Sequence, residues 1–183
     1  MINSSISVVI PFYNRSKFLE RTLDGVLSQT LQPVITYVVD NGSSKQEYKK
    51  VKEIILFKKY SNLNIKFLST EKNGNANYAR NLGYKLSQTK YVAFLDSDDW
   101  WSPQHLENSV ETLRRSGRSA IYSGAIIHNK YGDFVKYSID VNCFDNPFAL
   151  ILSKEGYMAV TPSYLIDKDC VGDNVVWDTN LKR

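Results

Sequence analysis

Short apolar runs alternate with longer segments of helical periodicity through the first half of the chain. The runs at 6–10 (ISVVI) and 35–39 (ITYVV) are almost free of polar residues, which is typical of parallel strands buried on both faces. Two further strands are predicted at 65–68 and 91–95, and each stops at turn-forming or charged residues. The segments between and after them predict four helices, at about 17–28, 46–59, 76–87 and 104–116.

This strand–helix alternation predicts an α/β sandwich with a mostly parallel central sheet. Ser16 is the expected N-cap of the first helix, and Gly117 the expected C-cap of the fourth. After residue 118 the pattern changes to strands, with a late β-hairpin turning at 131–133 (Tyr-Gly-Asp). A short helix is predicted at 146–152. The segments 164–170 and 175–183 are ambiguous between strand, helix and loop.

Length and composition set wide limits on the kind of protein. A chain of 183 residues suggests one domain with a substantial core. No stretch of 18 residues lacks polar side chains, and no basic, apolar leader is visible, so we expect a cytoplasmic protein. The net charge of +4 suits an anionic small ligand and is compatible with peripheral association at the inner face of a membrane. Because the basic residues are scattered, nucleic acid is not an expected partner.

Polar clusters follow three of the four predicted parallel strands. They are 11–14 (PFYN), 40–43 (DNGS) and 96–99 (DSDD). In open α/β sheets, ligands bind beyond the carboxyl ends of the strands. We therefore expect these clusters to converge on one pocket.

The three carboxylates at 96–99 call for a positive partner, because like charges at this spacing repel and are costly to bury unpaired. One or two carboxylates, completed by water and phosphate, suit Mg²⁺ or Mn²⁺. Such an ion would bridge a diphosphate and neutralise the charge of the leaving group. The alternative for these acids is a solvated turn or helix N-terminus. Arg80, on the helix after NGNAN, could reach a phosphate, form a salt bridge with one of these acids, or do both.

Four motifs in order, ISVVIPFYN, VVDNGSS, NGNANYARNLG and YVAFLDSDDWWSP, resemble the family 2 glycosyltransferases of the GT-A fold. The resemblance covers residues 5–125 well and the remainder more loosely. It implies a Rossmann-like α/β/α sandwich in one glycosyltransferase domain. Residues 1–118 would form its nucleotide-binding half, and 119–183 the incomplete start of an acceptor-side half.

The resemblance implies a nucleotide-diphospho-sugar donor and a divalent cation, Mn²⁺ or Mg²⁺. It makes Asp98 the expected direct metal ligand, Asp96 a contact of the ribose or sugar and of the metal, and Arg80 a neighbour of the diphosphate. The family's Asp-Asp pair after the second strand is here Asp40-Asn41. Because an amide both donates and accepts hydrogen bonds, several nucleotide bases are compatible with this position, and uracil is favoured. The expected donor-binding residues are Pro11, Phe12, Tyr13, Asn14, Asp40, Asn41, Asn73, Arg80, Asp96 and Ser97.

The resemblance also implies where the general base lies. In the family it is usually an acid in a pair that follows a stretch resembling GFDEsLk. The segment 175–183 (VVWDTNLKR) resembles that stretch, so the base is expected beyond Arg183. The expected function is inverting transfer of a sugar to a glycan or lipid-linked acceptor in polysaccharide synthesis, with this chain binding donor well and transferring poorly.

Three other functions are weaker alternatives. A nucleotide-sugar-binding module without transferase activity would share every donor-side feature. A sugar-phosphate nucleotidyltransferase needs a glycine-rich loop after the first strand, where this chain has PFYNRSK. A phosphatase with an Asp-x-Asp nucleophile would carry it after the first strand rather than the fourth.

Overall fold

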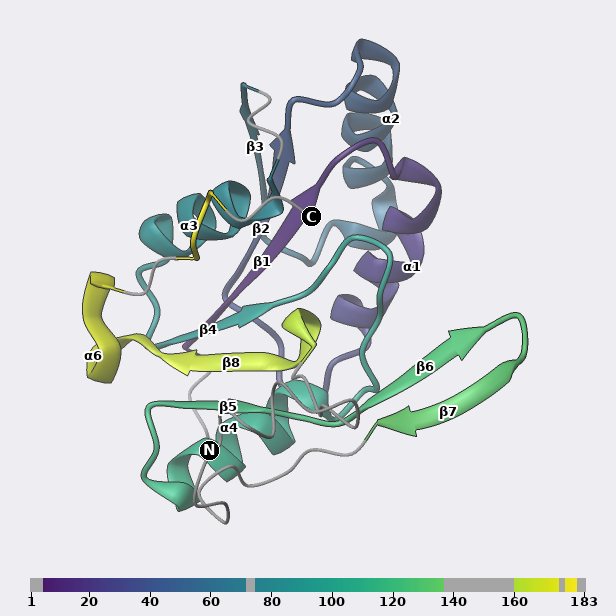
Figure 1. The fold of residues 1–183 in the computed structure, drawn as a ribbon. Helices are drawn as coiled ribbons and strands as arrows, with labels where there is room; N and C mark the ends of the chain where they lie inside the picture. Colours follow the sequence, from purple (N-terminus) through teal and green to yellow (C-terminus); the bar gives the residue numbers. More distant parts are fainter. Residues whose placement is uncertain (1–4, 72–74, 137–159, 175–176, 181–183) are drawn as a thin grey trace.

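A computed structural model gives the fold for residues 5–71, 75–136, 160–174 and 177–180 (Figure 1). The described residues form a six-stranded sheet of order β3-β2-β1-β4-β8-β5 and a separate hairpin of β6 and β7. The strands are β1 (Ile6–Phe12), β2 (Ile35–Asn41), β3 (Ile65–Thr70), β4 (Tyr91–Phe94), β5 (Ala120–Tyr122), β6 (Ala125–Asn129), β7 (Gly132–Lys136) and β8 (Tyr164–Asp167). The helices are α1 (Ser16–Leu27), α2 (Lys45–Ile55), α3 (Ala76–Leu86), α4 (His105–Ser116) and α6 (Lys168–Val171), with 3₁₀ turns at Lys58–Tyr60, Thr161–Ser163 and Gly172–Asn174.

Two layers of helices cover the sheet, which confirms the predicted α/β fold. The first four strands are parallel, whereas β8 runs antiparallel to both β4 and β5. Val8 and Ile10 of β1 pack in the core that α1, α2 and α4 cover. Val9, between them, packs in the opposite core with α3. Successive side chains of a strand face opposite ways, so a strand buried on both sides must be apolar throughout.

The strand β1 continues through Pro11 to Phe12, two residues beyond its predicted end. Val9 accepts a hydrogen bond from the Leu95 N–H at 3.0 Å, so its polar backbone groups face the β4 side. Pro11 is two residues further along, so its backbone faces the same side as that of Val9. However, β4 ends at Phe94, which pairs with Val9. The missing N–H of Pro11 therefore breaks no ladder bond, and pairing with β2 continues.

Two predicted helix boundaries are wrong. Ser16 is the first residue of α1 and not its cap; the N-cap position is Arg15, which makes no capping side-chain hydrogen bond. The helix predicted at 46–59 ends at Ile55 and is followed by the 3₁₀ turn. That turn brings the buried Tyr60 hydroxyl within 3.0 Å of the Glu20 carbonyl on α1. The tertiary contact replaces a further turn of helix.

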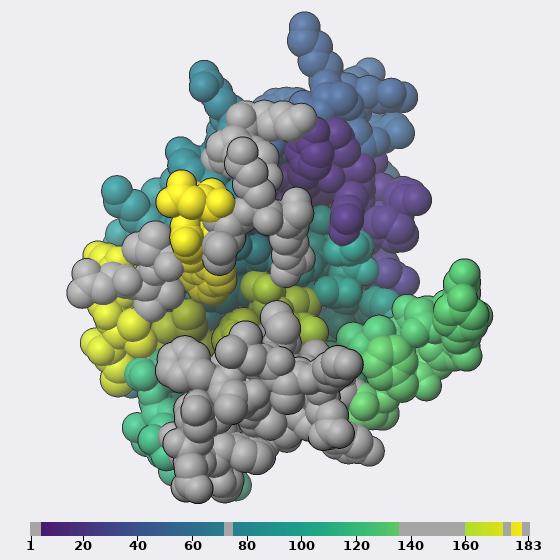
Figure 2. Space-filling view, in the orientation of Figure 1, coloured from purple at the N-terminus to yellow at the C-terminus, as the bar shows by residue number. Residues whose placement is uncertain are grey.

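The late part of the chain completes the sheet. The predicted hairpin is present as β6–β7, but Asn129 pairs with Gly132, so the turn is one residue earlier than expected. The hairpin extends away from the body (Figure 2). The ambiguous segment 164–170 forms β8 and most of α6. The helix predicted at 146–152 lies outside the described residues.

Three asparagines of the α3 region hold the described part of 175–183. Asn81 accepts a hydrogen bond from the Trp177 N–H at 2.8 Å and donates to the Trp177 carbonyl at 2.9 Å. Asn77 donates to the carbonyl of Asp178 at 2.9 Å, and Asn75 to that of Thr179 at 3.2 Å. The Trp177 ring packs on Phe94 with centroids 4.4 Å apart. The segment therefore lies along α3.

Candidate functional site

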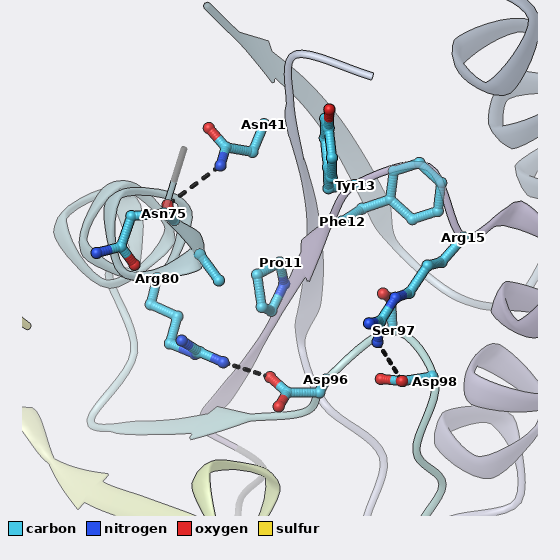
Figure 3. Close-up of a pocket in the computed structure, with 11 residues that line it drawn as sticks. Pro11, Phe12, Tyr13, Arg15, Asn41, Asn75, Arg80, Asp96, Ser97 and Asp98 are labelled. Atoms are coloured by element: carbon cyan, nitrogen blue, oxygen red, sulfur yellow. Dashed lines mark hydrogen bonds and ion pairs between the residues drawn. The ribbon is translucent and has the colours of Figure 1, made fainter. Parts of the chain in front are cut away.

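A cleft of about 330 Å³ opens at the carboxyl ends of β1, β2 and β4 (Figure 3). Most of the residues predicted from the polar clusters meet there. The sheet topology accounts for this convergence, because these three strands are parallel neighbours. The lining residues are Pro11, Phe12, Tyr13, Arg15, Asn41, Asn75, Ala76, Arg80, Asp96, Ser97 and Asp98.

A buried ion pair forms one wall of the cleft. Arg80 donates to Asp96 Oδ1 at 2.6 Å and to the Asn77 side-chain oxygen at 2.9 Å. The Arg80 side chain is only 5% exposed. Its Nε is buried and has no hydrogen-bond partner within the described structure. The carboxylate fixes the guanidinium at the wall of the cleft, where its N–H groups could also donate to an anionic ligand.

The carboxylate of Asp98 meets a second arginine. It forms an ion pair with Arg15, from the loop between β1 and α1. Arg21 of α1 donates to the Asp98 carbonyl at 2.7 Å, and the Thr22 hydroxyl donates to the Ser97 carbonyl at 3.0 Å. The backbone of the acidic loop is thus fixed by α1, whereas the Asp98 side chain remains 35% exposed.

Asn14 and Asp40 were predicted donor contacts, but neither belongs to the residues that line the cleft. Asn14 has φ +51°, accepts from the Ser44 N–H at 2.9 Å and donates its own N–H to the Ser43 hydroxyl at 3.0 Å. Asp40 is 1% exposed and accepts from the Ser43 N–H and the Ser69 hydroxyl. Both side chains therefore organise the loops after β1 and β2.

The neighbouring Asn41 does line the cleft, and its amide donates to the Asn75 carbonyl at 3.1 Å. Asn73 lies outside the described residues. The sequence interpretation missed Arg15, Asn75 and Ala76 as lining residues. The only available signal for Arg15 was its place next to the first polar cluster, in PFYNRSK.

A second, larger cavity of about 1000 Å³ shares Asp96 and Asp98 with the cleft. It runs between the acidic loop and the β6–β7 hairpin. Trp100 is 42% exposed and stacks on His128 at 5.0 Å, whereas Trp101 is 6% exposed and donates to the Pro162 carbonyl. Both tryptophans line the cavity, Trp101 as a buried part of its wall and Trp100 as an exposed one.

Two titratable groups beside this cavity have shifted pKa values. Burial, reinforced by the charges of Asp98 and Asp96, raises the pKa of Asp99 to about 6. Burial lowers the pKa of His105 to about 4, so its imidazole is neutral at pH 7. Clustered like charges and desolvation thus act in the directions expected for a low-dielectric site.

The donor set of the acidic loop fits a hard divalent cation. Within the described residues, no group of three or more His, Cys, Asp or Glu side chains is arranged as a metal cage. Mg²⁺ and Mn²⁺ do not require one, because one or two carboxylates, water and substrate phosphate complete their shells. Asp98 and Asp96 supply two such carboxylates on the rim of the cleft. Both are neutralised here by guanidinium groups.

The family described as Glycosyl transferase family 2 matches residues 7–164. The chain belongs to this family. The family 2 chain is 35% identical over 115 residues to the "Amylovoran biosynthesis glycosyltransferase AmsB" of Erwinia amylovora, covering 63% of this chain and 38% of the relative. It is 32% identical over 133 residues to "UDP-Glc:alpha-D-GlcNAc-diphosphoundecaprenol beta-1,3-glucosyltransferase WfgD" of Escherichia coli, covering 71% and 50%. The chain thus spans half or less of these relatives.

Two solved structures share the fold of the family 2 chain. The S. aureus TarS fragment 1–349 in complex with UDP has a TM-score of 0.70 at 22% identity, covering 97% of this chain and 51% of TarS. The mannosyltransferase PcManGT of Pyrobaculum calidifontis, in complex with GDP-Man and Mn²⁺, has a TM-score of 0.70 at 16% identity, covering 98% and 49%. These likenesses confirm the GT-A type of α/β sheet. Among the described residues, none of the helices is long and apolar enough to cross a membrane.

Proposed function

We propose that this chain forms the donor-binding part of a metal-dependent, inverting glycosyltransferase. The substrate would be a nucleotide-diphospho-sugar, with a UDP-sugar favoured, and the acceptor a glycan or lipid-linked hydroxyl in the synthesis of a cell-surface polysaccharide. The observation that carries the proposal is the convergence of Pro11–Tyr13, Asn41, Arg80 and Asp96–Asp98 on one cleft in a family 2 chain.

The roles of the residues follow from their chemistry. The apolar and aromatic side chains of Pro11, Phe12 and Tyr13 would pack on the base, beside the amide of Asn41. Arg80 would donate to the diphosphate while staying paired with Asp96. Asp98, with Asp96, would hold Mn²⁺ or Mg²⁺, which offsets the negative charge that develops on the departing nucleoside diphosphate. Asn14 and Asp40 would act on the donor through the loops that they hold.

The names of the relatives support this donor and acceptor class. WfgD is named for UDP-Glc and a diphosphoundecaprenol-linked sugar, and the TarS structure contains UDP. A lipid-linked acceptor would bring the enzyme to the inner face of the membrane. The general base stays a prediction, an acid beyond Arg183. An activated acceptor hydroxyl would attack the anomeric carbon opposite the leaving group, which inverts the configuration.

A thermal-shift panel tests the donor site. UDP, GDP, dTDP and CDP are each added with and without Mn²⁺, because a ligand that binds the folded state raises its stability by RT ln(1 + [L]/Kd). We expect the largest shift with UDP and Mn²⁺. Asp98→Asn should weaken the Mn²⁺-dependent binding by at least about tenfold, the cost of losing even an indirect metal contact.

Glu111→Gln, which removes one negative charge from an exposed position on α4, is the matched control and should keep the wild-type shift. If no nucleotide at millimolar concentration stabilises the wild-type protein, the proposed function is wrong. If nucleotides bind but the full reading frame transfers no sugar from any donor, the chain is a binding module instead.

A further inference from the structure

We propose that Arg15 and the catalytic cation compete for the Asp98 carboxylate, and that Arg15 turns to the diphosphate when the cation and donor bind. This inference rests on the proposed donor site and adds a residue that the sequence motifs do not mark. Arg15 would be both a competitor of the metal and a contact of the substrate.

The two arginines of the cleft differ in how firmly they are held. Arg80 is 5% exposed and donates to both Asn77 and Asp96, so its guanidinium is fixed by packing. Arg15 is 54% exposed, and Asp98 is its one described side-chain partner. An exposed ion pair of this kind contributes little and is readily exchanged. Arg15 is therefore the cation that a metal ion can displace.

The backbone around Asp98 supports an exchange of partners without rearrangement of the loop. The Asp98 carbonyl is held by Arg21, and the Asp99 N–H donates to the Asp96 carbonyl at 3.1 Å. Only the carboxylate has to change its partner, from a guanidinium to a divalent cation. Both are cations, so the Asp98 carboxylate keeps a positively charged partner before and after the exchange, and the second positive charge of the metal is available to the diphosphate.

The displaced guanidinium remains next to the donor. Arg15 and Arg80 both line the cleft, and Figure 3 draws them on either side of it, with their guanidinium groups directed at Asp98 and Asp96. A diphosphate bound between these carboxylates and the base pocket would lie within the reach of the Arg15 side chain. Guanidinium groups bind phosphate oxygens in a bidentate manner. The diphosphate would therefore replace the Asp98 carboxylate as the anionic partner of Arg15.

This exchange predicts effects of opposite sign for a single substitution. In Arg15→Gln, Mn²⁺ alone should bind about two- to fivefold more tightly, because the competing exposed ion pair is gone. UDP in the presence of saturating Mn²⁺ should bind about tenfold more weakly, because a charged hydrogen bond to phosphate is lost. A purely structural role for Arg15 would weaken both.

The experiment measures free Mn²⁺ by electron paramagnetic resonance with MnCl₂ as the probe, and then UDP affinity by calorimetry at saturating Mn²⁺. Arg15→Lys keeps the positive charge but lacks the planar guanidinium group. Its Mn²⁺ affinity should therefore stay near wild type, and its UDP affinity should fall by less than that of Arg15→Gln. Arg118→Gln, an exposed charge after α4, controls for the change in net charge and should leave both affinities unchanged.

Unchanged or weaker Mn²⁺ binding in Arg15→Gln, with wild-type thermal unfolding of the metal-free variant, would overturn the inference. The failure of the proposed function is visible separately, in the wild-type protein, as the absence of binding by all four nucleoside diphosphates. In that case the inference falls with it. Tighter Mn²⁺ together with weaker UDP supports it.

Discussion

Gly83 sets how closely α3 approaches the sheet. A Cβ built at this position would lie 2.3 Å from Cγ1 and 2.8 Å from Cγ2 of Val9, which is fully buried in the middle of β1. Val9 is short and branched at Cβ, so it cannot swing away as the end of a flexible side chain could. The helix that carries Arg80 is thus seated directly on the strand that leads to the cleft.

Gly83→Ala should therefore destabilise the protein, although alanine usually stabilises a helix interior by about 1 kcal/mol relative to glycine. The expected loss is about 1–3 kcal/mol, the range for overpacking a core. Urea denaturation followed by circular dichroism measures it. The double substitution Gly83→Ala with Val9→Ala should recover part of the loss relative to the sum of the single changes. A gain in stability from Gly83→Ala alone would contradict this packing.

At the residue scale, the sequence predicted the acids and missed the arginine. Asp96, Ser97 and Asp98 follow an apolar run, so their place beyond a strand end could be read directly. The partner of Asp98 could not, because Arg15 lies 83 positions away and its contact depends on the path of two loops. Asn14 and Asp40 were predicted as donor contacts because they share the right strand ends. Their hydrogen bonds to the serines at 43, 44 and 69 could not be read from a pattern.

At the scale of elements, α1 and α2 are joined by one carboxylate. Glu47 in the first turn of α2 accepts the Ser16 N–H through Oε2 at 2.8 Å, at the first turn of α1. This backbone hydrogen bond is the main cause that lowers the pKa of Glu47 below its ordinary value of 4.5. Glu47 thus satisfies one of the free N–H groups in the first turn of α1, a helix whose N-cap residue, Arg15, makes no capping side-chain hydrogen bond.

A lowered pKa in the folded state means that this contact stabilises the protein above pH 4.5 and is lost as the pH falls through the lower folded-state value. We expect the difference in unfolding free energy between wild type and Glu47→Gln to be constant from pH 7 to 5 and to shrink below pH 4.5. Urea titrations at several pH values measure it. Glu53→Gln, at an exposed position of α2, should show no such dependence of comparable size. A difference that is independent of pH would contradict the role of the charge.

The parallel strands could be predicted to within two residues, because each is a mostly apolar run that ends in turn-forming or charged residues. The strand β8 could not. Its four residues sit between β4 and β5, with Leu165 opposite Ala93 and Ile121, and a run this short fits strand or helix equally. The segment forms a strand because it can pair with the free edge of β4, a contact that the sequence pattern does not reveal.

At the scale of the whole molecule, the sheet does not end where the sequence pattern changes. The strands β8 and β5, from beyond residue 118, extend the same sheet past β4: β8 pairs with β4, and β5 pairs with β8. Leu165 and Ile166 are buried in the two opposite cores of that sheet. The two halves expected from the sequence therefore share both hydrophobic cores, one on each face of the sheet.

A chain of residues 1–118 should consequently not fold as a stable unit. Losing Leu165 and Ile166 alone removes about 3–6 kcal/mol of apolar burial, a large part of the 5–15 kcal/mol that stabilises a typical domain. It also exposes β4 as an edge strand. We expect this fragment to aggregate in size-exclusion chromatography and to show no cooperative unfolding, whereas the full chain should elute as a discrete species and unfold cooperatively. A monomeric fragment that unfolds cooperatively would contradict the dependence of residues 1–118 on the strands that follow them.

Asn14 connects the loop after β1 to the loop after β2 through two hydrogen bonds: its backbone N–H donates to the Ser43 hydroxyl, and its side-chain oxygen accepts from the Ser44 N–H. Its φ of +51° is a conformation that asparagine tolerates better than most residues. These loops directly follow Phe12 and Asn41, the last residues of β1 and β2, which would flank the nucleotide base at the proposed donor site. The two loops are therefore already fixed relative to each other in the folded protein, before a nucleotide binds. Preorganisation of this kind lowers the entropic cost of association, so donor capture at this end of the cleft should proceed as rigid docking, with the rearrangement confined to the phosphate end.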